Sequence, residues 1–251
     1  RHIDSLIGSN DIDGVIICSP SKYHLEQIRL LSGRIRNIFC EKPLGLSIKE
    51  IMKAKKSIED NGLNLHVGFN RRFDPDFSRL KENIIDGEIG KLHTIKITSR
   101  DPSPPSIKYI ERSGGLFLDM TIHDFDMVKY LSDSEICEIY AKGKCMVDPE
   151  IAKANDIDTA ITNMTLKKGI IAIINNSRQA VYGYDQRIEV IGSKGALQVG
   201  NQLLHGVRKG TENGFSSANP KHFFIDRYQE SYRIEMLNFI RSIKGDPVPH
   251  A

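Results

Sequence analysis

The sequence predicts a chain of class α/β plus α+β, in which a parallel sheet with helices precedes a larger part with a mostly antiparallel open sheet. Residues 1–70 alternate between short β-branched runs and helical segments, which is the rhythm of βαβ units. From residue 71 onward, long strands follow one another through tight turns with few helices between them, which favours antiparallel pairing. We therefore expect two domains, 1–70 and 71–251.

The first part predicts three strands and two helices after an initial helical tail at Ile3–Ile7. Gly14–Cys18 is a continuous β-branched run, which is typical of a strand buried on both faces of a parallel sheet. The remaining elements expected here are a helix at His24–Leu31 ended by Gly33, a strand at Ile35–Cys40, a helix from the capping box at Ser47 to Asn61, and a strand at Leu63–Phe69.

The second part predicts a sheet of long strands. A helix at Asp74–Asp86 opens it, and Lys167–Gly169 and Ser193–Gly195 are typical hairpin turns. The strands expected are Leu92–Arg100, Ile136–Val147, Thr159–Leu166, Ile170–Ser177, Arg187–Ile191, Ala196–Val199 and Leu203–Val207, and two further helices are expected at Leu116–Leu131 and Tyr228–Ile243.

Composition narrows the function classes. The chain has 251 residues with 39% hydrophobic and 27% charged residues, which suffices for a packed core. Its net charge of +3 is too small to indicate a nucleic-acid or membrane partner, and no run approaches the ~18 apolar residues of a membrane span. Four cysteines without a C-x-x-C pair fit a reducing compartment, so we expect a cytoplasmic protein.

The first candidate for chemistry is Glu41-Lys42-Pro43, directly after a strand. Ligands bind at the carboxyl ends of strands in open α/β sheets, so Lys42 can direct its charge into a cleft and take part in proton transfer. Pro43 can fix the turn through a cis bond. A solvated lysine in an ordinary polar turn is the alternative.

The second candidate is the pair Asp119 and His123, four residues apart on one face of the expected helix. An aspartate beside a histidine orients the ring and stabilises the imidazolium, which suits a proton relay. An ordinary helix side-chain pair is one alternative. A metal site that adds Asp124 and Asp126 is another, but the sequence lacks H-x-x-x-H and H-E-x-x-H, so no metal is expected.

The third candidate is Tyr182, whose hydroxyl could bond a polyol, although a turn with half-buried aromatic residues explains this stretch equally well. The sequence contains no G-x-S-x-G, no Walker A motif and no stripe of basic and aromatic residues. These absences argue against the common hydrolase, NTPase and nucleic-acid-binding classes.

Taken together, these residues resemble the Gfo/Idh/MocA family of NAD(P)-dependent oxidoreductases. The resemblance rests on four segments in register over nearly the whole chain, and the stretches DMTIHDFDM and YGYDQR are most similar to inositol 2-dehydrogenases. The segments are Val15–Pro20 followed by His24, Glu41–Pro43, Gly68–Phe73 and Gly115–Asp126. The family fold implied is a Rossmann domain followed by an α+β domain whose open sheet often serves as the interface of a homo-oligomer.

The resemblance also implies roles for individual residues. His123 would accept the proton of a secondary hydroxyl on a cyclic polyol or sugar, Lys42 would hydrogen-bond that oxygen, and Asp119 would hold His123 and the substrate. NAD is the expected cofactor, with NADP left open. The residues implied for the cofactor are Ser19, Pro20, His24, Glu41, Lys42 and Arg71, and those implied for the substrate are Asn70 and Tyr182.

One departure from the family pattern concerns the cofactor. The family begins with a strand, G-x-G-x-x-G and an acidic residue about 20 positions later, and none of these is in this sequence. We therefore expect a partial Rossmann domain, with weak or absent NAD binding by the chain as printed. A non-catalytic relative that serves as an oligomerisation or ligand-binding module is the competing interpretation.

Overall fold

The computed structural model describes residues 3, 6 and 11–249. The chain forms two compact units, residues 1–73 together with 231–251, and residues 74–230. The predicted domain boundary at residue 70 lies near the junction of these units, whereas the end of the chain groups with the first unit and not with the second. The expected helix at Ile3–Ile7 lies largely outside the described residues. Each unit is described below by itself.

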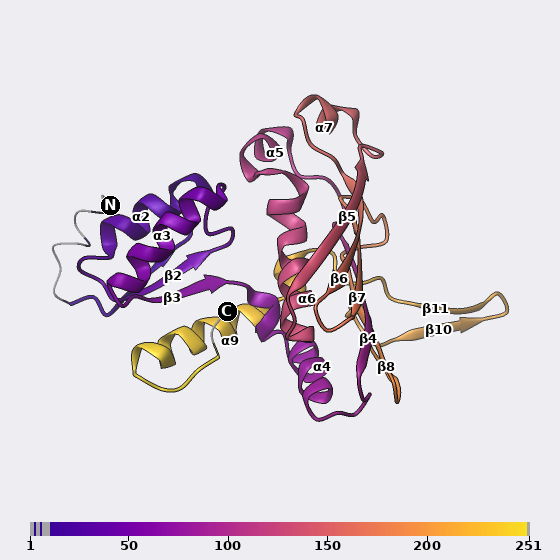
Figure 1. The fold of residues 1–251 in the computed structure, drawn as a ribbon. Helices are drawn as coiled ribbons and strands as arrows, with labels where there is room; N and C mark the ends of the chain where they lie inside the picture. The colour runs from indigo at the N-terminus through magenta and orange to yellow at the C-terminus, as the bar shows by residue number, and fades with distance from the viewer. Residues whose placement is uncertain (1–2, 4–5, 7–10, 250–251) are drawn as a thin grey trace. The chain divides into compact units, whose positions relative to one another are not determined.

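The first unit contains a three-stranded parallel sheet with strand order β1-β2-β3, as the sequence predicts (Figure 1). The α-helices α2 and α3 alternate with the strands, and most of α9 also belongs to this unit. The bounds are β1 Gly14–Ile17, η1 Ser21–Tyr23, α2 His24–Leu31, β2 Asn37–Glu41, α3 Ile48–Asp60, β3 Asn64–Gly68, η2 Asn70–Phe73 and α9 Gln229–Ile243.

Apolar residues of β2 form the centre of the hydrophobic core of the first unit. Ile38, Phe39 and Cys40 are all buried, which is the expected pattern for a strand covered on both faces. Ile28 and Leu31 of α2 pack into the same cluster as Ile38 and Cys40, because one face of this helix is apolar. The ring of Phe39 also contacts Phe239 of α9, with centroids 5.8 Å apart. The first unit therefore has its own hydrophobic core.

The second unit is built on a six-stranded sheet with strand order β5-β6-β7-β4-β8-β9 (Figure 1). Its strand pairs are antiparallel except β4 with β7, which confirms the predicted, mostly antiparallel open sheet. The bounds are β4 Leu92–Arg100, β5 Ile136–Lys144, β6 Thr159–Leu166, β7 Ile171–Ser177, β8 Asp185–Gly192 and β9 Ala196–Val199.

The helices α4 and α6 lie along one face of this sheet (Figure 1). Period-two alternation points Ile95, Ala172 and Val190 toward a buried face of the sheet. Asp74 caps α4 by accepting the backbone N–H groups of Asp76 and Phe77, and it also pairs with the buried Arg227. The helices of this unit are α4 Pro75–Ile85, α5 Ile107–Ser113, α6 Ile122–Ser132, α7 Pro149–Lys153 and α8 Phe224–Arg227.

Several segments of the second unit differ from the sequence prediction, among them the short helices α5 and α7, which the sequence analysis did not predict. The expected helix at Leu116–Leu131 is divided into a π-helical turn at Phe117–Thr121, labelled η3, and α6. The expected strand at Leu203–Val207 is wrong, because Leu203 makes only an isolated bridge to Pro220. A separate hairpin, β10 Arg208–Thr211 and β11 Gly214–Ser217, follows instead, and all of its residues are exposed. Exposed polar strands carry no alternating apolar pattern by which they could be detected.

Within the described part of the chain, no helix is both long and apolar enough to cross a membrane. Cys18, Cys40, Cys137 and Cys145 are all free thiols. Burial is the main cause that raises the pKa of the Cys40 thiol to about 12, so this cysteine is a packing residue of the β2 core rather than a reactive thiolate.

Candidate active site

Lys42 follows the last residue of β2, at the carboxyl end of the parallel sheet. The Lys42–Pro43 peptide bond is cis, as the sequence analysis suggested. Glu41 accepts the Lys42 backbone N–H at 3.3 Å, and burial raises the pKa of its carboxyl group while Lys42 and His24 oppose that shift. A Cβ at Gly68 would lie 2.9 Å from Glu41 Oε2, so only glycine leaves room for the carboxylate there.

The buried ring of His24 joins two loops at the carboxyl ends of the strands. Its Nε2 lies 2.7 Å from the carbonyl oxygen of Ser19, in the loop after β1, and its Nδ1 lies 2.9 Å from that of Pro43. Either tautomer donates an N–H to at least one of these carbonyls. His24 therefore holds together the loops that carry Ser19, Pro20 and Lys42.

Asn70 and Arg71 begin the short 3₁₀ turn η2, two residues after β3. Both side chains are buried, and Asn70 is only 2% exposed. Its amide nitrogen Nδ2 has no hydrogen-bond partner among the described residues. A buried amide donor without a partner is costly in a folded protein, and it is a feature expected of a site that binds a polar ligand.

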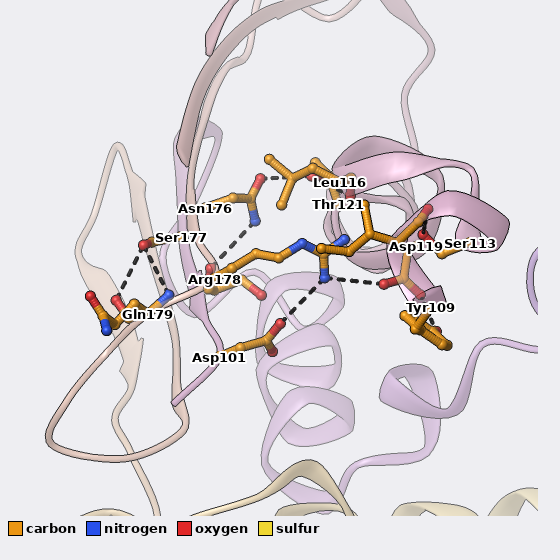
Figure 2. Close-up of polar contacts among 12 residues, drawn as sticks. Asp101, Tyr109, Ser113, Leu116, Asp119, Thr121, Asn176, Ser177, Arg178 and Gln179 are labelled. Carbon is orange, nitrogen blue, oxygen red and sulfur yellow. Dashed lines mark hydrogen bonds and ion pairs between the residues drawn. The ribbon is translucent and has the colours of Figure 1, made fainter. Parts of the chain in front are cut away.

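Asp119 lies in the π-helical turn η3 of the second unit, where its two carboxylate oxygens have different partners (Figure 2). The Tyr109 hydroxyl donates a 2.8 Å hydrogen bond to Oδ1, and Arg178 Nη1 donates a 3.1 Å bond to Oδ2. Burial, and then the negative charge of Asp119, raise the pKa of the Tyr109 hydroxyl, which keeps this donor protonated. The carboxylate is therefore fixed in orientation by a phenol and a guanidinium.

Local sequence explains how the π-helical turn is anchored. Gly114 and Gly115 have φ values of 88° and 82°, which glycine adopts without strain, and they turn the chain sharply out of α5. Thr121 then donates to Asn176 Oδ1 at 2.9 Å, and Asn176 Nδ2 donates to Asp124 at 2.7 Å. These buried contacts tie the end of the turn and the beginning of α6 to β7. Such turns are frequent at functional sites.

His123 is the second residue of α6, four positions after Asp119 as the sequence indicates, and its side chain is half-buried. Asp119 and His123 belong to the second unit, whereas Lys42 belongs to the first. The meeting of all three around one substrate oxygen stays a prediction. Within the second unit, Asp119 itself is anchored by Tyr109 and Arg178 rather than freely solvated.

Tyr182 forms part of a separate polar network near the start of β8. Its hydroxyl donates to Asp185 Oδ2 at 2.6 Å and accepts from Arg100 Nη1 at 3.0 Å. Asp185 is fully buried, and its hydrogen bonds, among them those from Arg187 and Tyr182, hold its carboxyl pKa below the usual value despite that burial. The ring of Tyr182 is 40% exposed, so this residue can still meet a ligand.

Sequence reasoning missed several residues that surround Asp119. They are Asp101, Tyr109, Asp156 and Arg178. A usable signal existed for two of them, because Asp101 and Arg178 directly follow the strands β4 and β7. Among the described residues, no group of three or more His, Cys, Asp or Glu side chains is arranged to hold a metal ion.

Comparison with protein families matches both parts of the chain. Residues 1–69 match the model described as "Oxidoreductase family, NAD-binding Rossmann fold", and residues 77–198 match "GFO/IDH/MocA C-terminal domain". The three-stranded parallel sheet is therefore a Rossmann sheet, as the resemblance implied.

Individual relatives agree with this assignment. The chain is 47% identical over 238 residues to an uncharacterized oxidoreductase, YrbE, of Bacillus subtilis, covering 95% of this chain and 70% of that protein. It is 44% identical over 243 residues to the myo-inositol 2-dehydrogenase of Thermotoga maritima, covering 96% and 73%. A crystal structure of scyllo-inositol dehydrogenase from Lactobacillus casei, with bound NAD(H) and scyllo-inositol, has a TM-score of 0.89 at 32% identity, covering 98% and 74%. The chain thus belongs to the Gfo/Idh/MocA family of oxidoreductases.

Proposed function

We propose that this protein oxidises a secondary hydroxyl of an inositol-like cyclic polyol with NAD as the hydride acceptor. The observation that carries the proposal is the anchored Asp119 carboxylate, which lies four residues before His123 in a chain that also carries Lys42 at the end of β2. The relatives named above include two inositol dehydrogenases, and one of them binds NAD(H) and scyllo-inositol.

Each of the three residues has a distinct task in this proposal. His123 accepts the proton of the substrate hydroxyl, so that the C–H pair of electrons can leave as hydride and the carbon becomes a carbonyl. Lys42 donates a hydrogen bond to the same oxygen and stabilises the negative charge that develops on it. Asp119 stabilises the imidazolium of His123 and bonds a substrate hydroxyl, while Asn70 and Tyr182 contact the remaining hydroxyls.

The residues of the first unit fit a nicotinamide cofactor. Polar groups follow each strand of the Rossmann sheet, and the unpartnered Asn70 Nδ2 leaves an open donor at that edge. Ser19, Pro20, His24, Glu41, Lys42 and Arg71 would line the cofactor. When bound, the nicotinamide supplies the hydride acceptor, with NADP left as an alternative. The chain itself supplies the proton acceptor and the groups that orient the substrate.

The sheet of the second unit supports a homo-oligomer as the assembly. Ile161, Ile171 and Ile173 are all exposed and lie on the same face of the neighbouring strands β6 and β7. A band of apolar side chains on one sheet is typical of a surface that packs against another protein. We propose that a second copy of the chain covers it. The free thiols fit the expected cytoplasmic location.

An assay of the full-length protein tests the proposed function. With NAD and myo- or scyllo-inositol, we expect formation of NADH in proportion to substrate oxidised, with a turnover of about 1–10³ s⁻¹. Mannitol, an acyclic polyol, serves as the control because its hydroxyls are not fixed on a ring. A protein that binds inositol but forms no NADH with any inositol isomer would instead support the non-catalytic interpretation.

A further inference from the structure

Arg178 is buried among three carboxylates of the second unit, and its side chain is only 1% exposed (Figure 2). Its Nη1 lies 3.1 Å from Asp119 Oδ2 and 3.7 Å from Asp101 Oδ2, and its Nη2 lies 3.9 Å from Asp156 Oδ2. A guanidinium compensates buried carboxylates better than an ammonium, because it is planar and weakly hydrated. Arg178 is therefore the cation that makes this acidic cluster possible.

The topology of the sheet fixes where Arg178 lies. The strands β4 and β7 are parallel neighbours, with Arg100 paired to Ser177, so the residues that follow them emerge side by side. Those residues are Asp101 and Arg178. The backbone N–H of Arg178 also donates to the Asp158 carbonyl at 2.8 Å, at the beginning of β6. The side chain thus starts from a backbone position that three strands hold in place.

Arg178 also lies beside Asp156, whose carboxylate binds the backbone at the beginning of the π-helical turn. Asp156 accepts the backbone N–H of Leu116 at 3.0 Å, and a Cβ at Gly115 would lie 2.8 Å from its Oδ1. Asp156 therefore holds the entry of the turn that carries Asp119. Arg178 therefore contacts Asp156, which binds the beginning of the turn, and Asp119, which is the acidic residue within it.

The side chain of Arg178 donates its hydrogen bond to Asp119. Among the described residues, its Nε and Nη2 have no hydrogen-bond partner, and its side-chain hydrogen bond goes to Asp119. Burying donors without hydrogen-bond partners destabilises a folded protein. An arginine kept for stability alone would satisfy more of its five donors, whereas functional sites tolerate such a cost.

We propose that Arg178 is a positioning residue of the dehydrogenase reaction, which holds the Asp119 carboxylate in the orientation that His123 and the substrate require. This inference rests on the proposed function, because it takes Asp119 as part of the reacting site. Arg178 donates to one carboxylate oxygen of Asp119 and Tyr109 donates to the other, so loss of Arg178 removes the donor that orients Oδ2.

The test compares Arg178→Gln and Arg178→Lys in the full-length protein, with Arg112→Gln on the exposed side of α5 as the control. Misplacing a reacting group by about 1 Å can cost ~10²-fold in rate, so we expect Arg178→Gln to lower kcat by ~10- to 10²-fold while KM changes by less than about threefold. Arg178→Lys should recover part of kcat, because it keeps a charge near Asp119. Arg112→Gln should leave both parameters unchanged.

An Asp119→Asn background separates positioning from a general structural role. If Arg178 acts through Asp119, Arg178→Gln should lower kcat by less than about twofold in that background, since coupled residues are not additive. A further loss as large as that in the wild type would overturn the inference. So would a folded Arg178→Gln protein with wild-type kcat. If that variant does not fold, Arg178→Lys is compared in the wild-type and Asp119→Asn backgrounds, and a loss of kcat as large in Asp119→Asn as in the wild type would overturn the inference.

Failure of the Arg178 inference can be distinguished from failure of the proposed function. A wild-type protein without inositol turnover contradicts the proposed function. The contact of Arg178 with Asp119 is then tested by thermal unfolding of the wild type, Arg178→Gln, Asp119→Asn and the variant that carries both substitutions. We expect Arg178→Gln and Asp119→Asn together to lower Tm by less than the sum of their separate shifts. Additive effects on unfolding would contradict the contact itself.

Discussion

Replacing His123 or Lys42 by alanine is expected to lower the turnover of the full-length protein on myo-inositol by ~10²-fold or more. His123→Ala removes the group that accepts the hydroxyl proton, and Lys42→Ala removes the donor that stabilises the developing alkoxide. Both effects fall mainly on kcat, because each interaction strengthens as the oxygen becomes negative. Steady-state kinetics with varied inositol measures them.

Matched controls exist on the surface of each unit. Lys49 is exposed in α3 and His93 is exposed in β4, so Lys49→Ala and His93→Ala remove the same side-chain types without touching the site. We expect wild-type turnover from both. Turnover that stays near the wild-type value in Lys42→Ala or His123→Ala, while the protein binds NAD, would remove that residue from the mechanism.

Glu235→Gln is expected to stabilise the protein increasingly as the pH rises. Glu235 lies in α9 with 3% exposure, and neither carboxyl oxygen has a hydrogen-bond partner among the described residues. Burial, with a smaller contribution from Glu41, raises the pKa of its carboxyl group from its ordinary value of 4.5 to about 9. The folded protein therefore keeps this carboxyl group protonated at neutral pH, whereas the same group exposed to water would be ionised.

The sign of the pH dependence follows from that raised pKa. Between pH 4.5 and pH 9, the folded state holds a proton that the unfolded state releases, so stability falls by about 1.4 kcal/mol per pH unit. Glutamine carries no such proton. The stabilisation by Glu235→Gln should therefore be small at pH 5 and reach at most about 5 kcal/mol at pH 8.

Thermal unfolding across pH 5 to 9 measures this effect in the full-length protein. A gain of 1 kcal/mol corresponds to about 2–4 °C in Tm for a domain of this size class. Glu230→Gln, on the exposed first turn of the same helix, is the control and should follow the wild-type pH curve. Parallel curves for the wild type and Glu235→Gln would contradict a protonated, buried Glu235.

The fold was largely predictable because its strands and helices carry strong periodic patterns. The bounds of β4, β6 and α2 agree with the sequence prediction residue for residue, since apolar side chains at period two or 3.6 define them. The hairpin β10–β11 has no buried side of its own, and the sequence analysis did not predict it, although an Asn-Gly pair such as Asn213-Gly214 is typical of a hairpin turn.

The candidate site was predictable only in part. Residues at the ends of parallel strands, such as Lys42, follow from a general rule of open sheets. The Asp119 environment does not, because Arg178 is 59 residues away along the chain and follows β7, to which Thr121 and Asp124 tie the helical segment that carries Asp119. The π-helical turn also changes which residues share a face of the helix, and a pattern of 3.6 residues per turn does not predict this change.

The central claim is that Lys42 and His123 act on the same substrate oxygen, and a crystal structure of the full-length protein with NAD and myo-inositol tests it most directly. We expect the Lys42 ammonium and a ring nitrogen of His123 each to lie within about 3.2 Å of one inositol oxygen. A complex in which that oxygen contacts only one of them, or in which the two side chains line separate cavities, would contradict the account.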